Sequence, residues 1–163
     1  MAPLIRAVLS NLIGEEESSR IEIVANDAVV QPDGKWEIQY RHPSSGFGHD
    51  KSQAILPYRA LPSPPTIFFF GDGVSGASRS SFTSFDPRLF TRERCCADMS
   101  AARHADVLFV KKKPGADNDL AAYCTREGIP HVLFEDFNRA LGVVGQVVEG
   151  KLSVQDALAL GTA

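Results

Sequence analysis

The chain has 163 residues, of which 44% are hydrophobic and 23% are charged, and its formal net charge is −3. This length and balance predict one globular domain over residues 1–163 with a sizeable core. The negative charge, with a pI near 5.8, argues against a nucleic-acid-binding protein. No apolar run approaches the length of a membrane span. We therefore expect neither nucleic acid nor a membrane among the partners.

The N-terminal stretch and the cysteines favour a cytoplasmic location. Residues 1–10 hold too short an apolar segment for a signal peptide, and the acidic residues 15–17 suit neither a secretory nor a mitochondrial leader. The three cysteines, Cys95, Cys96 and Cys124, are odd in number and lack metal-ligand spacing. Such a set fits a reducing compartment better than a disulfide scaffold.

Periodicity in the first sixty residues predicts four elements: a helix over 3–13, a strand over 20–26, a hairpin over 28–40 and a helix over 51–61. The hairpin turn is the Pro-Asp-Gly segment at 32–34. The helix after it is expected to start near His49 or Asp50, and Pro57 is a possible early break in it.

An apolar run at 67–70, bounded by prolines and glycines, predicts a strand buried on both faces at the centre of a parallel sheet. The run ends at Gly71-Asp72-Gly73, which puts a carboxylate at the carboxyl end of the strand. Ligands of open α/β sheets bind at that edge, so a metal or phosphate site is one interpretation. An ordinary turn is the other, because Asp and Gly are common turn residues.

Short apolar strands alternate with helices in the rest of the chain. The pattern predicts strands over 106–110 and 131–134 and helices over 99–103, 118–127, 137–149 and 154–160. Asp136 and Ser153 are suited to cap the last two helices. Such alternation is typical of an α/β fold with a mostly parallel sheet and flanking helices.

Several stretches together resemble the haloacid dehalogenase (HAD) superfamily, in its phosphoserine-phosphatase-like branch. The matching segments are residues 48–52, 71–75, 101–109 and 120–137. The resemblance implies a Rossmann-like core that includes nearly the whole chain except residues 76–97.

The resemblance also implies roles for three residues. Lys51 would neutralise the phosphoryl group of a phosphorylated small molecule, although a solvated helix residue is its other interpretation. Asp72 and Asp98 would hold Mg²⁺, which prefers hard oxygen ligands.

The chain departs from the family pattern in its nucleophile. The Asp-x-Asp-x-Thr motif is absent, and the nearest Asp-x-Asp, at 117–119, falls at a predicted helix start. We therefore expect an N-terminally truncated HAD-like protein that is non-catalytic or vestigial, because covalent phosphoryl transfer has no nucleophile. The alternative is a weak Mg²⁺-dependent phosphatase whose site is rebuilt by a partner chain or a recruited acid.

Residues 76–97 form the second departure. In the family, Asp98 would follow Ser75 directly, and deleting 76–97 restores that order. The segment is interpreted as a translated intron or a late insertion, with a functional loop as the alternative.

Loss of the family's first two strands would leave the 67–70 strand with an unpaired apolar edge. Such an edge templates association. The sequence therefore predicts a homodimer, symmetric or domain-swapped, through these edges.

Overall fold

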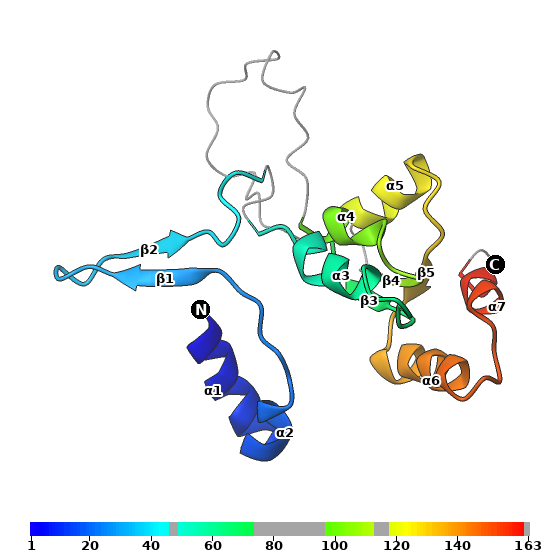
Figure 1. Ribbon diagram of the computed structural model, residues 1–163, viewed down its shortest axis with the longest axis horizontal. Coiled ribbons are helices and arrows are strands. Elements are labelled where there is room, and N and C mark those ends of the chain that lie inside the picture. Colours follow the sequence, from blue (N-terminus) through cyan, green and yellow to red (C-terminus); the bar gives the residue numbers. More distant parts are fainter. Residues whose placement is uncertain (46–48, 74–96, 113–117, 162–163) are drawn as a thin grey trace, which may run out of the picture. The chain divides into compact units, whose positions relative to one another are not determined.

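The computed structural model describes residues 1–45, 49–73, 97–112 and 118–161 (Figure 1). The chain divides into two compact units, Met1–Asp50 and Lys51–Ala163. The single domain over 1–163 stays a prediction.

The first unit holds two helices and a hairpin. The helices are α1 (Ala2–Ile13) and α2 (Glu15–Ser19), and the strands are β1 (Asp27–Val30) and β2 (Trp36–Gln39). The strands pair antiparallel from Asp27↔Gln39 to Val30↔Trp36. The turn between them has Gly34 at φ 82°, where an L side chain is strained. The predicted first helix and hairpin are thus confirmed.

The strand predicted over 20–26 is wrong, because this segment forms no strand and β1 begins only at Asp27. The reason lies in its hydrogen-bond partners. The guanidinium of Arg6 donates to the carbonyl of Ile21 at 2.6 Å and to the carbonyl of Ser18. A side chain of α1 therefore binds the backbone at the start of the segment. Alternating β-branched residues favour a strand only where another strand is present to pair with.

The second unit alternates helices and strands in the order α3 (Ser52–Arg59), β3 (Phe68–Gly71), α4 (Ala97–Ala102), β4 (Val107–Lys111), α5 (Asp119–Arg126), β5 (Val132–Phe134), α6 (Phe137–Val148) and α7 (Val154–Ala159). The three strands form one parallel sheet in the order β3-β4-β5. The predicted α/β class, with a parallel sheet, flanking helices and a hairpin, is confirmed.

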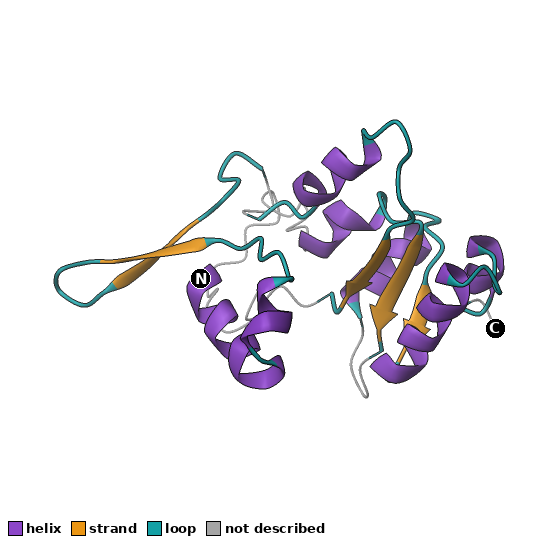
Figure 2. Ribbon diagram, turned by 60° about the horizontal axis from the view of Figure 1, so that its bottom comes forward, coloured by secondary structure: helices purple, strands orange, loops and turns teal. Residues whose placement is uncertain are grey.

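Helices cover both faces of this sheet (Figure 2). Successive residues of β4 point to opposite faces, as the pleat of a strand requires. Leu108 and Val110 pack with Leu120 and Cys124 of α5. On the other face, a second cluster joins strands to α6 and α7, with the members Val107, Phe109, Val132, Phe134 and Ala140. The core therefore lies in two layers around β4.

The central position predicted for the 67–70 strand is wrong. In the described part of the chain, the middle strand is β4, whose residues 107–110 are all buried, whereas β3 lies at an edge with half-buried phenylalanines, in agreement with the unpaired edge predicted for it. Both strands are continuous apolar runs. Such a run indicates burial within a sheet, but it does not give the order of the strands.

The helix starts follow the predicted capping for α6 and α7. Asp136 accepts a hydrogen bond from Asn138 N at 3.0 Å, and Ser153 accepts one from Asp156 N at 3.0 Å. The early break predicted at Pro57 is absent, since α3 continues through it to Arg59. No helix in the described part of the chain is both long and apolar enough to cross a membrane.

Candidate functional site

The site begins at the turn that follows β3, where two glycines allow close packing. Gly73 has φ 70°, and a Cβ on it would lie 2.6 Å from Asn118 Oδ1. A Cβ on Gly71 would lie 2.6 Å from a methyl group of Leu120 and 3.0 Å from Asp98 Oδ2. Real Cβ atoms do not approach other atoms so closely, so the packing of this turn requires glycine at positions 71 and 73.

Asp98 ties this turn to α4. Its side chain is only 4% exposed, in the first turn of the helix. Oδ2 accepts hydrogen bonds from Asp72 N at 3.2 Å and Gly73 N at 3.1 Å, and Oδ1 forms an ion pair with Lys51 Nζ. The structure therefore brings Lys51, Asp72 and Asp98 together, although 47 residues separate Lys51 from Asp98 in sequence.

Lys51 is the residue directly before α3, and its side chain extends to the site. Its side chain is 40% exposed, so the ammonium group is open to solvent on one side while it pairs with Asp98. Nζ also lies 5.9 Å from the ring centroid of Phe69. The first residue of α3 is bound to α4, since Ser52 N donates to Ser100 Oγ at 3.3 Å. A half-exposed lysine beside a buried carboxylate can still contact an anionic ligand.

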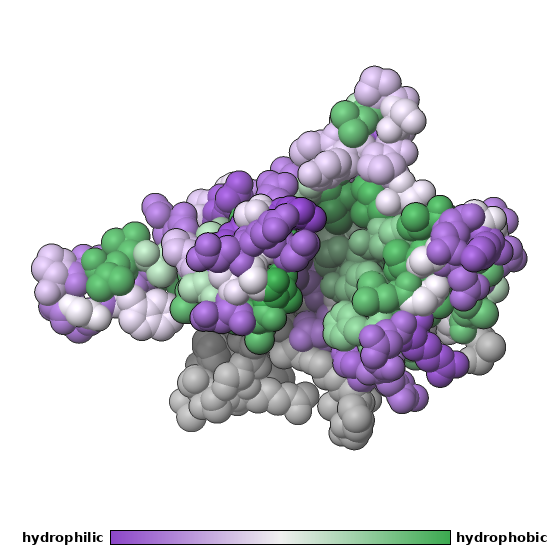
Figure 3. Space-filling view, turned by 90° about the horizontal axis from the view of Figure 1, so that it is seen from below, coloured by the Kyte–Doolittle hydropathy of each residue, from purple (hydrophilic) through white to green (hydrophobic). Residues whose placement is uncertain are grey.

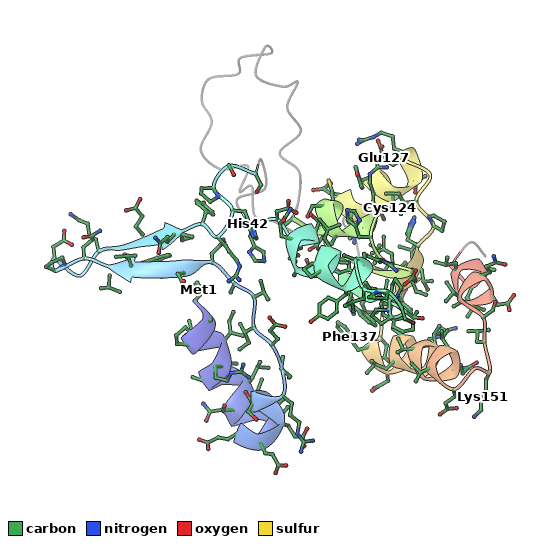
Figure 4. The ribbon with its side chains drawn as sticks, in the orientation of Figure 1. Met1, His42, Cys124, Glu127, Phe137 and Lys151 are labelled. Carbon is green, nitrogen blue, oxygen red and sulfur yellow. The ribbon has the colours of Figure 1, made fainter. Side chains whose placement is uncertain are left out.

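The lysines at the end of β4 have other partners. Lys112 pairs with Glu135 at 2.8 Å, and this contact lowers the pKa of the Glu135 carboxyl. Lys111 donates to the carbonyl of Glu135 and lies 5.4 Å from the ring centroid of Phe137, which stands at the start of α6 (Figure 4). Lys111 and Lys112 are therefore both bound to residues that follow β5.

The donor set suits Mg²⁺ held largely by water. Mg²⁺ is commonly bound by one or two carboxylates together with several waters. Asp72 is exposed at the strand end, with the buried Asp98 directly behind its backbone. Within the described residues, no three His, Cys, Asp or Glu side chains are grouped to hold a metal. Among the described residues, Asp72 offers the exposed carboxylate, whereas the oxygens of Asp98 already bind two backbone N–H groups and Lys51. The metal role of Asp72 and Asp98, like the phosphate role of Lys51, stays a prediction.

Sequence reasoning did not identify Asn118, the N-cap of α5, as part of this site. Its amide lies against the turn after β3. The only local signal is an Asn directly before a helix, which predicts a cap and nothing more.

Part of the predicted site region lies outside the described residues. Of the predicted insertion 76–97, the structure describes only Ala97, the first residue of α4. Cys95 and Cys96 lie outside it as well.

Comparison with known proteins relates this α/β chain to a phosphatase. It is 31% identical over 166 residues to the polyol phosphate phosphatase PYP1 of Saccharomyces cerevisiae, covering 97% of the chain and 58% of that protein. It is 42% identical over 139 residues to Pdp3-interacting factor 1 of Schizosaccharomyces pombe, covering 84% of the chain and 49% of that protein. No family model matches the chain, and no solved structure matches it significantly.

The chain spans about half the length of the curated relatives it matches. The phosphatase-like relation that the motifs predicted is confirmed by PYP1 at this coarser level. Membership of the HAD superfamily, with the predicted truncation and insertion, stays a prediction.

Proposed function

We propose that this chain forms the Mg²⁺-binding and phosphate-binding part of a phosphatase-type site and that it is non-catalytic by itself. One observation carries the proposal: Lys51, Asp98 and the backbone of Asp72 meet at the carboxyl end of β3. The relation to a polyol phosphate phosphatase supports a phosphorylated small molecule, such as a polyol phosphate, as the ligand class.

Each residue has a role that its environment suits. Asp72 is exposed and supplies a carboxylate to Mg²⁺, while Asp98 stands behind it and holds the turn. Lys51 offers a positive charge toward the phosphoryl group. When bound, Mg²⁺ would offset the negative charge of that group.

The non-catalytic part of the proposal rests on the residues available as nucleophile. Family-type phosphoryl transfer needs an aspartate that forms a covalent intermediate. The chain has one Asp-x-Asp, at 117–119, and the residue two positions after it is Ala121, not the Thr of the family motif. Its middle residue, Asn118, caps α5. Asp119, the second aspartate of the pair, is the first residue of α5, whereas Asp117 lies outside the described residues.

The test is Mg²⁺ binding by calorimetry, followed by a phosphatase assay with an aryl phosphate and glycerol phosphate. Wild type is expected to bind Mg²⁺, and Asp72→Asn is expected to bind it at least roughly tenfold more weakly. The matched control is Asp33→Asn, the same change in the exposed hairpin turn, which should bind like wild type.

Neither wild type nor Asp72→Asn should release phosphate above background. Failure of wild type to bind Mg²⁺ would reject the proposed site. Turnover that Asp72→Asn abolishes would reject the non-catalytic reading and establish the alternative, a weak Mg²⁺-dependent phosphatase.

We also propose that the chain associates as a homodimer through the free edge of β3. In the described residues, β3 pairs with β4 alone, and its phenylalanines are half-buried. Unpaired strand edges of this kind template pairing with another chain.

Two smaller proposals complete the assignment. Residues 76–97 are an insertion in the phosphatase pattern, and a genomic sequence without splice-like boundaries at its ends would argue against a retained intron. The location is the cytoplasm, which localisation of a tagged full-length protein would test.

A further inference from the structure

The side chain of Asn118 joins three elements at the carboxyl end of the sheet. Its Oδ1 accepts hydrogen bonds from Leu120 N at 3.0 Å and Ala121 N at 3.1 Å, which caps α5. Its Nδ2 donates to the carbonyl of Lys111, at the end of β4, and to the carbonyl of Asp72 at 3.5 Å. An asparagine amide has two N–H donors and two acceptor lone pairs, so these four bonds use its full capacity.

This amide and Asp98 hold the turn after β3 from different directions. Asp98 Oδ2 accepts from the N–H groups of Asp72 and Gly73, whereas Asn118 donates to the carbonyl of Asp72. Oδ1 of Asn118 also occupies the space that a Cβ of Gly73 would need. The peptide unit that carries the Asp72 carboxylate is therefore bound through both its donor and its acceptor.

A cap alone would not need an amide. Asp136 and Ser153 cap α6 and α7 by accepting from backbone N–H groups of their own helices. An aspartate or a serine at position 118 could cap α5 equally well. Capping does not use the two N–H donors of Asn118. They bind the carbonyls of Lys111, at the end of β4, and of Asp72, directly after β3.

We propose that Asn118 is a positioning residue of the candidate site, which fixes the Asp72–Gly73 turn and with it the carboxylate offered to Mg²⁺. The proposal rests on the proposed function. A plain N-cap would affect the stability of its helix and leave metal affinity unchanged. The proposal instead expects the two N–H donors of Asn118 to affect the affinity for Mg²⁺.

The experiment compares Asn118→Ser with Asn118→Ala and with Ser153→Ala. Asn118→Ser keeps an acceptor for the cap and removes both amide donors, while Ser153→Ala removes a cap on a different helix. Three quantities are measured: the unfolding midpoint, the affinity for Mg²⁺ alone by calorimetry, and exchange of the Gly73 amide proton by NMR.

Asn118→Ser is expected to unfold at a midpoint closer to that of wild type than Asn118→Ala does. It should bind Mg²⁺ about tenfold more weakly than wild type, as changes in residues behind metal ligands typically do. Its Gly73 amide should exchange faster than in wild type. Ser153→Ala should lower the midpoint and leave Mg²⁺ affinity and Gly73 exchange unchanged.

Unchanged Gly73 exchange in Asn118→Ser would overturn the inference. Faster exchange with unchanged Mg²⁺ affinity would overturn it too, because the turn would then be free to move without affecting the site. If wild type binds no Mg²⁺, the proposed function fails separately, and Gly73 exchange alone decides whether Asn118 holds the turn.

Discussion

At the scale of one residue, the same Gly→Ala substitution is expected to have opposite effects on stability at Gly73 and at Gly142. It has φ 70° and no room for a Cβ beside Asn118 and Leu120, whereas Gly142 lies inside α6 with nothing within 4 Å of a Cβ. Gly73→Ala is expected to destabilise the fold by about 1–3 kcal/mol. Gly142→Ala is expected to stabilise it by about 0.5–1 kcal/mol through helix propensity.

Urea unfolding of both variants beside wild type measures this contrast. A Gly73→Ala variant as stable as wild type would contradict the strained and closely packed turn, and a destabilised Gly142→Ala would contradict the gain in helix propensity.

Cys124 predicts a pH dependence of stability. Its thiol is fully buried in α5, and burial raises its pKa from an ordinary value of 9.0 to about 11 (Figure 4). The folded state therefore keeps the proton that the unfolded state loses above pH 9. Its contribution to stability is complete below pH 9 and is lost as the pH rises toward 11.

The measurement is the urea midpoint from pH 8 to 11 for wild type and Cys124→Ala. The variant lacks this titration, so the difference between their midpoints should shrink as the pH rises. A difference that stays constant over this range would contradict the buried neutral thiol.

At the scale of elements, the position of a strand in the sheet determines how much stability is lost when one of its leucines is replaced by alanine. Leu108, in the central β4, is 1% exposed, and Leu133, in the edge strand β5, is 44% exposed. Leu108→Ala is expected to cost about 2–5 kcal/mol, because it leaves a cavity between the sheet and α5.

Leu133→Ala makes the same chemical change and is expected to cost less than about 1 kcal/mol. Both free energies of unfolding come from denaturant titrations. Similar losses at the two positions would contradict the central place of β4.

The helices and the hairpin could be predicted from sequence because their signals are local. Asp136 and Ser153 lie next to the amides they cap, and the hairpin turn carries a glycine at positive φ. The order of the strands could not be predicted, because β3 and β4 are both apolar runs. Neither could the lack of a strand at 20–26, where Arg6 of α1 binds the carbonyl of Ile21 and no other strand pairs with the segment in the described residues.

The candidate site also contains residues that the sequence indicates and residues that it does not. Asp72 is visible from its place after an apolar run, but Asp98 follows it only after a long segment that breaks the motif. The link from Asn118 to the carbonyl of Asp72 spans 46 residues. A single sequence holds no signal for such a contact, because an asparagine at a helix start already has a local explanation as a cap.

At the scale of the whole molecule, both units leave apolar side chains on their surfaces (Figure 3). No residue of α1 is buried, and Leu12 is 75% exposed. In the other unit, Phe137 and Leu141 of α6 are exposed, and the phenylalanines of β3 are half-buried at the sheet edge. Among these side chains, the phenylalanines of β3 are the ones that the proposed pairing of two β3 edges would cover.

The proposed homodimer predicts a molar mass of two chains of 17.7 kDa, or about 35 kDa, by light scattering after gel filtration. Thr66→Lys places a charge at an exposed position two residues before β3, and edge lysines oppose strand pairing. It should lower the measured mass toward that of one chain. Thr125→Lys makes the same change on the exposed surface of α5 and should leave the mass at that of two chains. A wild type of one-chain mass would contradict the dimer, and equal masses for the two variants would contradict pairing through the β3 edge.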